Sequence, residues 1–352
     1  MVNRKTLTIP NIAEIDIPLP AVLTGIIGGY SIPDALDFLS EGSKEERLMV
    51  ASICGRVDEI KELIDKTSFD KRLLVKMLKR CVKFGDLWIV KFLRKRGVTM
   101  KDVEMESFSL DGKIDAKVFQ DDDDKFHPDI FFSIVQNDRF DCLKEFLDNW
   151  NIYTPRRGTQ DLYHIIDLCG EFGNIRCFQE TIKHFPEGKF DFYDDDCSLI
   201  YNVCTFGNID MFEMLEKDYK ITIDHLVDGN ALQAAASYNQ IQMLQVLRSR
   251  GLTGDHVKKL SVSKVVTSAY YSPCNLFYII ARKGYSDVLK EFRSGWGLTL
   301  GDILYDEMII EIMFAKKRYQ CIEELNNWVK SKGDFDRLTE VISKYQARFS
   351  RD

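Results

Sequence analysis

The chain lacks most of the features by which enzymes, zinc proteins and membrane proteins are recognised from sequence. Its nine cysteines include no Cys-x-x-Cys pair, the spacing typical of zinc and redox sites. No apolar run reaches the ~20 residues that a membrane-spanning helix needs. Eight prolines and 21 glycines in 352 residues are too few for a linker-rich chain, and 45% hydrophobic residues is the composition of an ordinary globular protein.

Signals of secretion are also missing. Glu14 and Asp16 lie where a signal peptide would need an apolar core, and no Asn-x-Ser/Thr sequon occurs. Most of the cysteines stand within apolar helical patterns, where a free thiol behaves as a small buried hydrophobe. We therefore expect a reducing compartment, the cytosol or the nucleus, and we predict a cytoplasmic protein.

The usual catalytic and ligand-binding motifs are absent from the sequence. None of the five histidines forms a His-Glu-x-x-His pattern, and neither a Gly-x-x-x-x-Gly-Lys-Ser/Thr loop nor a Gly-x-Ser-x-Gly elbow occurs. The carboxylates Asp194, Asp195 and Asp196 are consecutive, whereas calcium loops need interleaved ligands, so we interpret them as a solvated connector. We predict no catalytic residue, no metal ligand and no cofactor, and hence a protein that is not an enzyme.

What the sequence does contain is an internal repeat. A nine-residue pattern begins with a turn-like residue and places apolar residues two, five and eight positions later. Five of the seven intervals between successive copies lie between 30 and 35 residues, and the two longer ones fit one unit plus an insertion. The copies begin at Gly55, Gly85, Asp138, Gly173, Gly207, Asn239, Gly284 and Lys317.

The chemistry of this pattern predicts a helix–turn–helix hairpin in each copy. The turn residue is Gly in five copies and Asn or Asp in two, the residues that best tolerate a left-handed backbone. Apolar residues three apart lie on one face of the helix that follows. The residue four positions before the turn is apolar in every copy, as close contact between helices requires. These residues are Ala51, Cys81, Ile134, Cys169, Val203, Ala235, Ile280 and Met313.

A connector motif with Thr and Asp follows several copies, and three of its four occurrences also contain Gly. The Gly is expected to end the second helix of the hairpin, and Thr and Asp are both helix N-cap residues for a short following turn. No single hairpin could bury its apolar face alone, so the sequence predicts an all-α solenoid of about eight stacked helical hairpins. The connectors are 96–102, 220–224, 250–255 and 296–302.

The period near 33, the paired helices and the Gly-Asn/Asp-Ile/Leu turns resemble ankyrin repeats. The copy over 231–253, Ala-Leu … Asn-Gln-Ile-Gln-Met-Leu-Gln-Val-Leu … Gly-Leu-Thr, is most similar to the divergent ankyrin repeats of large DNA viruses of protists. The resemblance covers about residues 47–330, although the Thr-Pro-Leu-His start of typical ankyrin units is missing from every copy. It implies a protein that binds other proteins, with a host protein as the partner class.

Both ends of the chain depart from the repeat. We predict that residues 1–46 form an N-terminal cap, the solenoid occupies 47–330, and 331–352 form a C-terminal capping helix. An alternative for the first segment is a degenerate F-box-like adaptor, suggested by Leu-Pro-Ala-Val-Leu-Thr-Gly-Ile-Ile over 19–27. The apolar face of the C-terminal helix comprises Leu338, Val341, Ile342 and Tyr345.

Charge is unevenly distributed along the chain. The net charge of −7 argues against a nucleic-acid binder by bulk charge, yet 71–101 holds eleven basic residues and one acidic residue. The following 23 residues, 102–124, hold nine acidic and two basic residues, within an insertion predicted near 102–127. One interpretation is internal compensation or simple solvation of both blocks. The other is a binding patch for an acidic or phosphate-rich partner, with the insertion as an autoinhibitory competitor. The candidate patch is Lys76, Lys79, Arg80 and Lys83.

Three functions follow from these observations. The first is a protein–protein interaction scaffold without catalytic activity, in which the repeat surface binds a partner protein. The second is a substrate adaptor for a ubiquitin ligase, which would need the segment 1–46 to dock a ligase subunit. The third is a binder of anionic ligands, nucleic acid or phosphoinositide, through the basic second repeat.

Overall fold

The computed structural model describes residues 47–48, 51, 57–66, 69, 71–103, 129–150, 160–186, 190–192, 198–262, 276–304 and 306–349. These residues form helices joined by turns, with no strand among them, so the prediction of an all-α protein is confirmed. The predicted N-terminal cap, the acidic stretch 104–127 and Asp194–Asp196 lie outside the described residues. The chain divides into two compact units, Met1–Ser133 with Asp148–Trp150, and Ile134–Leu147 with Asn151–Asp352.

The first unit is built around one helical hairpin. Its helices α5 and α6 pack against each other, and a helical turn over 100–103 follows them. The division between the units falls within the next hairpin, formed by α8 and α9. The helices are α4 (Val57–Lys66), α5 (Lys71–Phe84), α6 (Leu87–Lys95), α8 (Asp129–Gln136) and α9 (Phe140–Asn149).

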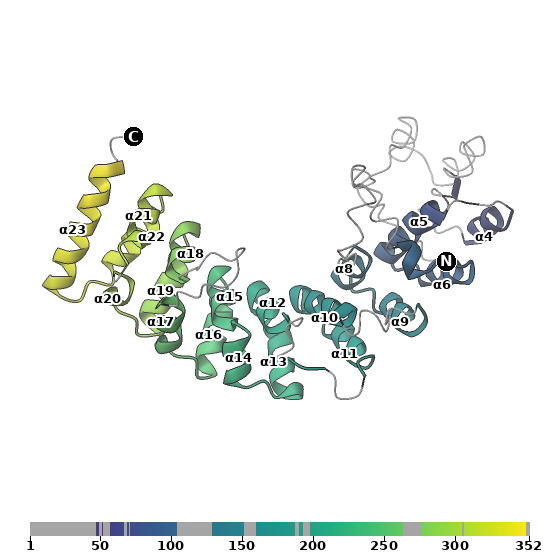
Figure 1. The fold of residues 1–352 in the computed structure, drawn as a ribbon, viewed down its shortest axis with the longest axis horizontal. Coiled ribbons are helices and arrows are strands. Elements are labelled where there is room, and N and C mark those ends of the chain that lie inside the picture. Colours follow the sequence, from purple (N-terminus) through teal and green to yellow (C-terminus); the bar gives the residue numbers. More distant parts are fainter. Residues whose placement is uncertain are drawn as a thin grey trace, which may run out of the picture. The chain divides into compact units, whose positions relative to one another are not determined.

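The second unit is a row of hairpins in chain order (Figure 1). Each first helix packs on the first helix of the next hairpin, from α10 through α12, α15 and α18 to α21, and α23 packs on α21. The first helices are α10 (Gln160–Phe172), α12 (Leu199–Phe206), α15 (Ala231–Ser237), α18 (Leu276–Lys283) and α21 (Met308–Ala315). The second helices are α11 (Ile175–Ile182), α13 (Ile209–Tyr219), α16 (Ile241–Ser249), α19 (Ser286–Gly295) and α22 (Tyr319–Asn326). Short helices and a long terminal one complete it: α14 (Ile223–Asp228), α17 (Gly254–Val262), α20 (Leu300–Ile303) and α23 (Lys332–Phe349).

The turn inside each hairpin has one geometry throughout the described chain. The turn residue is left-handed in every described copy, with φ between 50° and 84°, including Lys317 at 56°. The next residue donates its N–H to the carbonyl of the residue four before the turn, over 2.7–3.1 Å, which is the 6→1 bond of a Schellman motif. The left-handed turn predicted from Gly, Asn and Asp is therefore confirmed, and the same bond explains the fixed spacing to the upstream apolar residue.

Burial confirms most of the predicted core and corrects one part of it. The residues four before, five after and eight after the turn are buried in every described copy. The position two after the turn, predicted to be in the core, is half-buried in six described copies and exposed at Tyr319. The fourth position is buried instead, because residues at +4, +5 and +8 share one face at 3.6 residues per turn. Those core residues are Ile89, Cys142, Cys177, Met211, Met243, Val288 and Cys321.

Side chains at the turns tie each hairpin to the previous one, in a set of contacts that we call the turn ladder. The residue after the turn donates to a carbonyl at the C-terminal end of the preceding first helix, where helix carbonyls lack intrahelical partners. Asn208 Nδ2 donates to Gly170 O at 2.6 Å and to Glu171 O at 2.9 Å. The other rungs are Asn174 to Val135 O at 3.1 Å, Gln240 to Thr205 O at 2.9 Å and Arg318 to Arg282 O at 3.2 Å.

The turn ladder also explains why glycine recurs at the turns. At Gly207, φ is 70°, and an added Cβ would lie 2.5 Å from Oε1 of Gln240, the donor of the next rung. A side chain there would be strained by the backbone and would displace the rung. The close approach of successive turns therefore selects Gly.

Acidic residues form a second set of contacts, between successive second helices. Glu180 is buried, and it accepts hydrogen bonds from Lys144 on α9 at 2.9 Å and from Lys183 at 2.6 Å. The bond from Lys183 is the main effect that lowers the pKa of Glu180, against the opposing effect of burial. Glu291 likewise pairs with Arg248 on α16, over 2.9 Å. Loss of Lys144 or Arg248 would remove the cation that the preceding second helix places beside a buried carboxylate, so these contacts favour one register of the stack.

In each connector, a Thr bonds to the side chain of the residue three positions later, which refines the prediction from Gly, Thr and Asp. Gly97, Gly251 and Gly297 are left-handed and end the second helices, as predicted. Thr299 caps α20 and Asp302 accepts from its backbone N–H at 2.8 Å. At Thr222 and Thr253 the residue that accepts the backbone N–H is a histidine, His225 or His256, and not the Asp that precedes it.

The terminal helix α23 packs on α21 and buries Leu338, Val341 and Tyr345, whereas Ile342 is half-buried.

The six described cysteines that are free are all buried, as predicted from their apolar surroundings. They are Cys81, Cys142, Cys169, Cys177, Cys204 and Cys321.

Candidate functional site

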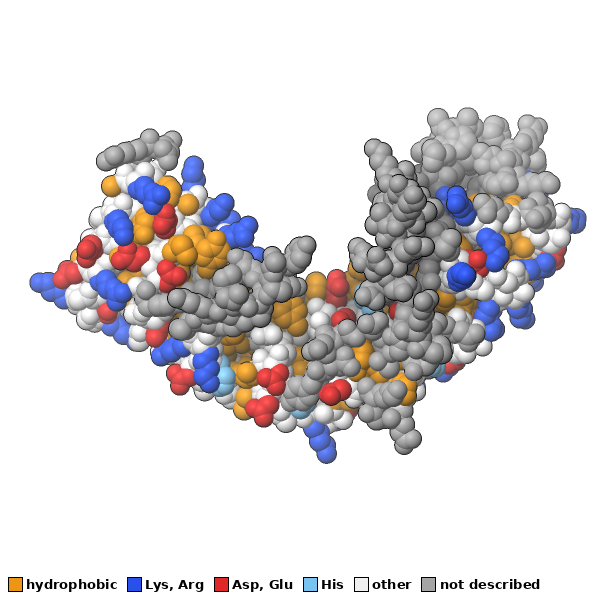
Figure 2. Space-filling view, viewed as in Figure 1, with side chains coloured by type: hydrophobic (Ala, Val, Ile, Leu, Met, Phe, Trp, Pro, Cys, Tyr) orange, Lys and Arg blue, Asp and Glu red, His pale blue; other side chains and the backbone are white. Residues whose placement is uncertain are grey.

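The candidate patch predicted from sequence lies on the outer face of α5. Lys76 and Lys83 are exposed, and Lys79 and Arg80 are half-buried. Together with the exposed Arg72, they occupy an arc of about 100° on the helix, opposite the buried apolar residues. The helix has no acidic residue. The structure therefore brings the predicted residues together on one stripe, and Lys and Arg side chains are prominent on this unit at the right of Figure 2.

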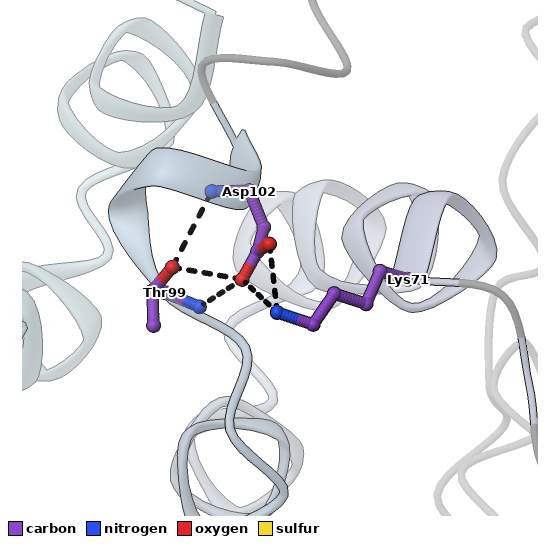
Figure 3. A network of polar contacts seen from close by, with 3 residues as sticks. All are labelled: Lys71, Thr99 and Asp102. Atoms are coloured by element: carbon purple, nitrogen blue, oxygen red, sulfur yellow. Dashed lines mark hydrogen bonds and ion pairs between the residues drawn. The ribbon is translucent and has the colours of Figure 1, made fainter.

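An ion pair fixes the N-terminal end of α5 (Figure 3). Lys71 Nζ lies 2.9 Å from Asp102 Oδ1 and donates to Oδ2 at 3.1 Å. Asp102 Oδ2 also accepts from the backbone N–H of Thr99 at 2.9 Å and from its hydroxyl at 2.8 Å. Asp102 thus completes the capping box of the turn over 100–103 and holds this turn against α5.

The same contacts set the ionisation of Asp102. Partial burial raises its pKa, but the hydrogen bonds from Lys71 and Thr99 outweigh burial, and the pKa lies below its ordinary value. Asp102 is the first residue of the acidic block and Lys71 the first of the basic block, so the two blocks meet at this point. A second pair in the unit joins Arg96 to Asp65 on α4. Part of the basic charge is therefore compensated within the hairpin.

A second basic surface, which sequence reasoning missed, lies on the turns of the C-terminal hairpins. We define the turn-edge surface by residues at three successive turns: Tyr238, Arg282, Lys283, Tyr285, Lys316, Lys317, Arg318 and Tyr319. All five cations are exposed, Tyr238 and Tyr319 are 45% and 60% exposed, and Tyr285 is half-buried. Lys and Arg side chains gather over these hairpins at the left of Figure 2.

Direct contacts make this surface continuous. Lys283 Nζ lies 4.2 Å from the ring centroid of Tyr238 and 5.7 Å from that of Tyr285, a cation–π arrangement. Lys283 also donates to Ser237 O at 2.9 Å. At this turn the residue that follows is Tyr285, which has no side-chain amide, so Lys283 makes this rung of the turn ladder instead. Arg318 donates to Arg282 O and covers Gly284, where an added Cβ would lie 2.7 Å from Arg318 Cδ.

The five cations of the turn-edge surface have no ion pair with any carboxylate among the described residues. The sequence around them explains this, because 281–286 and 315–320 contain no Asp or Glu. The available sequence signal was a basic pair at 282–283 and a basic triplet at 316–318, each followed closely by a tyrosine. The sequence does not connect the two groups, because they are more than thirty residues apart and are brought together by the packing of α18 on α21.

Comparisons with protein-family models, with curated proteins and with solved structures found no match to this chain. Among the described residues, no helix combines the length and apolarity needed to span a membrane.

Proposed function

We propose that this chain is a non-catalytic scaffold that binds a partner protein through the surface of divergent, ankyrin-like repeats. One observation carries the proposal: a constant turn geometry presents side chains that change from hairpin to hairpin and are exposed at the last four of these turns. The backbone turn is the same in every described copy. The residue just before it changes from hairpin to hairpin, in the order Asn137, Phe172, Phe206, Tyr238, Lys283 and Lys316.

The kind of side chain at these turns supports binding to a protein. Phe206, Tyr238 and Tyr319 are 46%, 45% and 60% exposed, although burying an aromatic ring stabilises a fold. Aromatic residues and Arg are enriched at protein interfaces and dominate their hot spots. The period near 33, the paired helices and the capped connectors support the ankyrin-like assignment, and that resemblance points to a host protein as partner.

Capture of a partner with matched variants tests this function. The full chain is immobilised, exposed to a eukaryotic cytosolic extract, and the bound proteins are identified by mass spectrometry. A partner that binds the repeat surface should no longer be captured by a variant with Phe206→Ser and Tyr238→Ser. It should be kept by a control that changes two exposed residues of second helices, Lys290→Ser and Glu323→Ser. The captured protein must then bind the purified chain in a one-to-one assay. If no captured protein binds in that assay, or if both variants bind equally, the scaffold function is wrong.

The basic stripe on α5 favours a second function, binding of an anionic ligand. A helix whose outer face holds five cations and no acid would concentrate phosphate groups, and such binding weakens steeply with salt. The test measures binding to duplex DNA and to phosphoinositide vesicles over a salt series. The variant reverses Lys76, Lys79, Arg80 and Lys83 to Glu. Salt-independent binding, or equal binding by the variant, would exclude this function.

A further inference from the structure

The turn-edge surface has the chemistry of a site for an acidic peptide. We infer that it binds an extended acidic segment of the partner protein, rich in Asp and Glu and carrying apolar or aromatic side chains between them. The inference rests on the proposed scaffold function and names the kind of partner. It concerns Tyr238, Arg282, Lys283, Tyr285, Lys316, Lys317, Arg318 and Tyr319 of the second unit.

Charge is the first argument. Several other cations of this unit are paired with carboxylates of neighbouring elements, for example Arg250 with Glu216 and Arg348 with Glu311. The five cations of the turn-edge surface lack such partners among the described residues. Mutual repulsion of uncompensated like charges disfavours the folded chain, and a segment of opposite charge would relieve it.

The backbone at Lys317 is the second argument. Lys317 occupies the left-handed turn position with φ of 56°, where five copies of the repeat have Gly and two have Asn or Asp. A side chain with a Cβ is strained in this conformation, and Lys, unlike Asn or Asp, has no short polar group that bonds locally to the backbone. The Lys317 side chain makes no hydrogen bond, ion pair or cation–π contact with the described residues. It therefore carries a cation at the tip of the turn at a cost to the fold.

The tyrosines are the third argument, and they favour a peptide that is not purely acidic. Tyr238, Tyr285 and Tyr319 line the row of cations, and Tyr offers a large apolar ring together with a hydroxyl that bonds to peptide groups. Lys283 lies against two of the rings, so charge and apolar area are presented together. A ligand that satisfies both must alternate carboxylates with apolar side chains.

A single-stranded nucleic acid could also combine charge with stacking, but the surroundings favour a short peptide. Nucleic-acid grooves follow the backbone over many phosphates, whereas the cations here span two adjacent turns. Asp287 is the second residue of α19, Glu323 lies on α22 four residues beyond Tyr319, and the whole chain carries a net charge of −7. These charges would repel a long polyanion and leave room for a few carboxylates.

Fluorescence anisotropy with the full chain tests the inference. The probe is a fluorescein-labelled peptide, Asp-Glu-Phe-Asp-Glu-Trp-Glu-Asp, measured at about 50 mM and about 300 mM salt. The comparison probes are the same peptide with Lys at every acidic position and a labelled oligothymidylate of equal charge. The test variants are Arg282→Glu with Lys316→Glu, and Tyr319→Ser alone. The matched control is Lys259→Glu with Lys290→Glu, exposed cations outside the surface, and far-UV circular dichroism verifies folding of each variant.

The expected result is binding of the acidic peptide that weakens with salt, with no binding of the basic peptide. Affinity should fall about tenfold or more in the charge-reversal variant and in Tyr319→Ser, and less than about twofold in the control. Absence of peptide binding, or equal loss in the control, would overturn the inference. Stronger binding of the oligothymidylate would overturn it in favour of nucleic acid. If a partner captured in the scaffold test still binds the charge-reversal variant, the acidic-peptide inference is wrong but the scaffold function stands. Failure of that capture refutes the scaffold.

Discussion

Asn208 offers the most direct test of whether the turn ladder holds the hairpins together. Its Nδ2 donates to Gly170 O at 2.6 Å and Glu171 O at 2.9 Å, at the C-terminal end of α10. Its side chain makes no capping bond to α13, the helix that it precedes. The substitution Asn208→Ala therefore removes two hydrogen bonds between hairpins without removing an N-cap bond.

The expected cost follows from the two bonds. Each contributes a net of roughly 0.5–1.5 kcal/mol, so the contact between α10–α11 and α12–α13 should weaken by about 1–3 kcal/mol. Since 1.4 kcal/mol is a factor of ten, local opening should become about 5- to 140-fold more frequent. Native-state hydrogen exchange read by mass spectrometry measures this directly. Repeat arrays open locally, so peptides from 160–186 and 198–219 should exchange faster and those from 306–349 should not.

Two further variants make the result decisive. Asn208→Asp keeps an oxygen for capping but loses both N–H donors and places a carboxylate against two carbonyl oxygens, so its effect should equal or exceed that of Ala. Asn326→Ala, at an exposed position of α22, should change the free energy of local opening by less than about 0.5 kcal/mol. The reasoning is refuted if Asn208→Ala behaves like Asn326→Ala, or if exchange rises uniformly along the chain.

Three more predictions address other parts of the molecule. Lys317→Gly should raise the free energy of unfolding by about 1 kcal/mol, measured by urea denaturation, because the left-handed turn no longer strains a Cβ; an unchanged or lower stability would contradict this. Asp102 has a pKa below its ordinary 3.8 in the fold, so its stabilising contribution is complete above that pH and disappears as pH falls through the lower folded value. Lys71→Met should therefore destabilise at pH 7 and much less at pH 2, in acid titrations followed by circular dichroism. Burial raises the pKa of Cys177 to about 12 and that of Cys321 to about 11, so iodoacetamide should alkylate them in the native protein far more slowly than in urea; equal rates would contradict their burial.

The repeat was predictable because its turn needs particular residues. A left-handed turn residue and an apolar residue four before it are parts of one Schellman motif, so a single backbone geometry leaves two marks at fixed spacing. The core of the second helix was predicted less accurately. Apolar residues at +2, such as Ile175, Ile209 and Ile241, read as a core position, yet they lie half-buried beside the turns. Residues at +2, +5 and +8 share a helix face as well as the buried residues at +4, +5 and +8 do. Periodicity alone therefore could not decide between the two sets.

Other features could not be predicted because they depend on how hairpins pair. Glu180 and Glu291 have the sequence pattern of surface residues, but stacking places a cation of the preceding second helix beside each. His225 belongs to no sequence motif of the usual kind, yet it takes the place of Asp in a capping box. The predicted patch on α5 was recoverable because it lies on a single helix. The turn-edge surface was not, since it joins turns of different hairpins.

Lys283 lets structural and binding roles of the turns be separated by experiment. In the other rungs the donor follows the turn, as at Gln240 and Arg318, but the corresponding Tyr285 has no amide or guanidinium, and Lys283 donates to Ser237 O from before the turn. Lys283→Ala should therefore lower the free energy of unfolding by about 1 kcal/mol or more, because the donor that it removes is charged. The same substitution should also weaken binding of the acidic peptide. Tyr285→Ser should lose affinity with little change in stability. Parallel urea unfolding and anisotropy measurements decide this, and equal stability of the two variants would show that Lys283 is not a rung of the ladder.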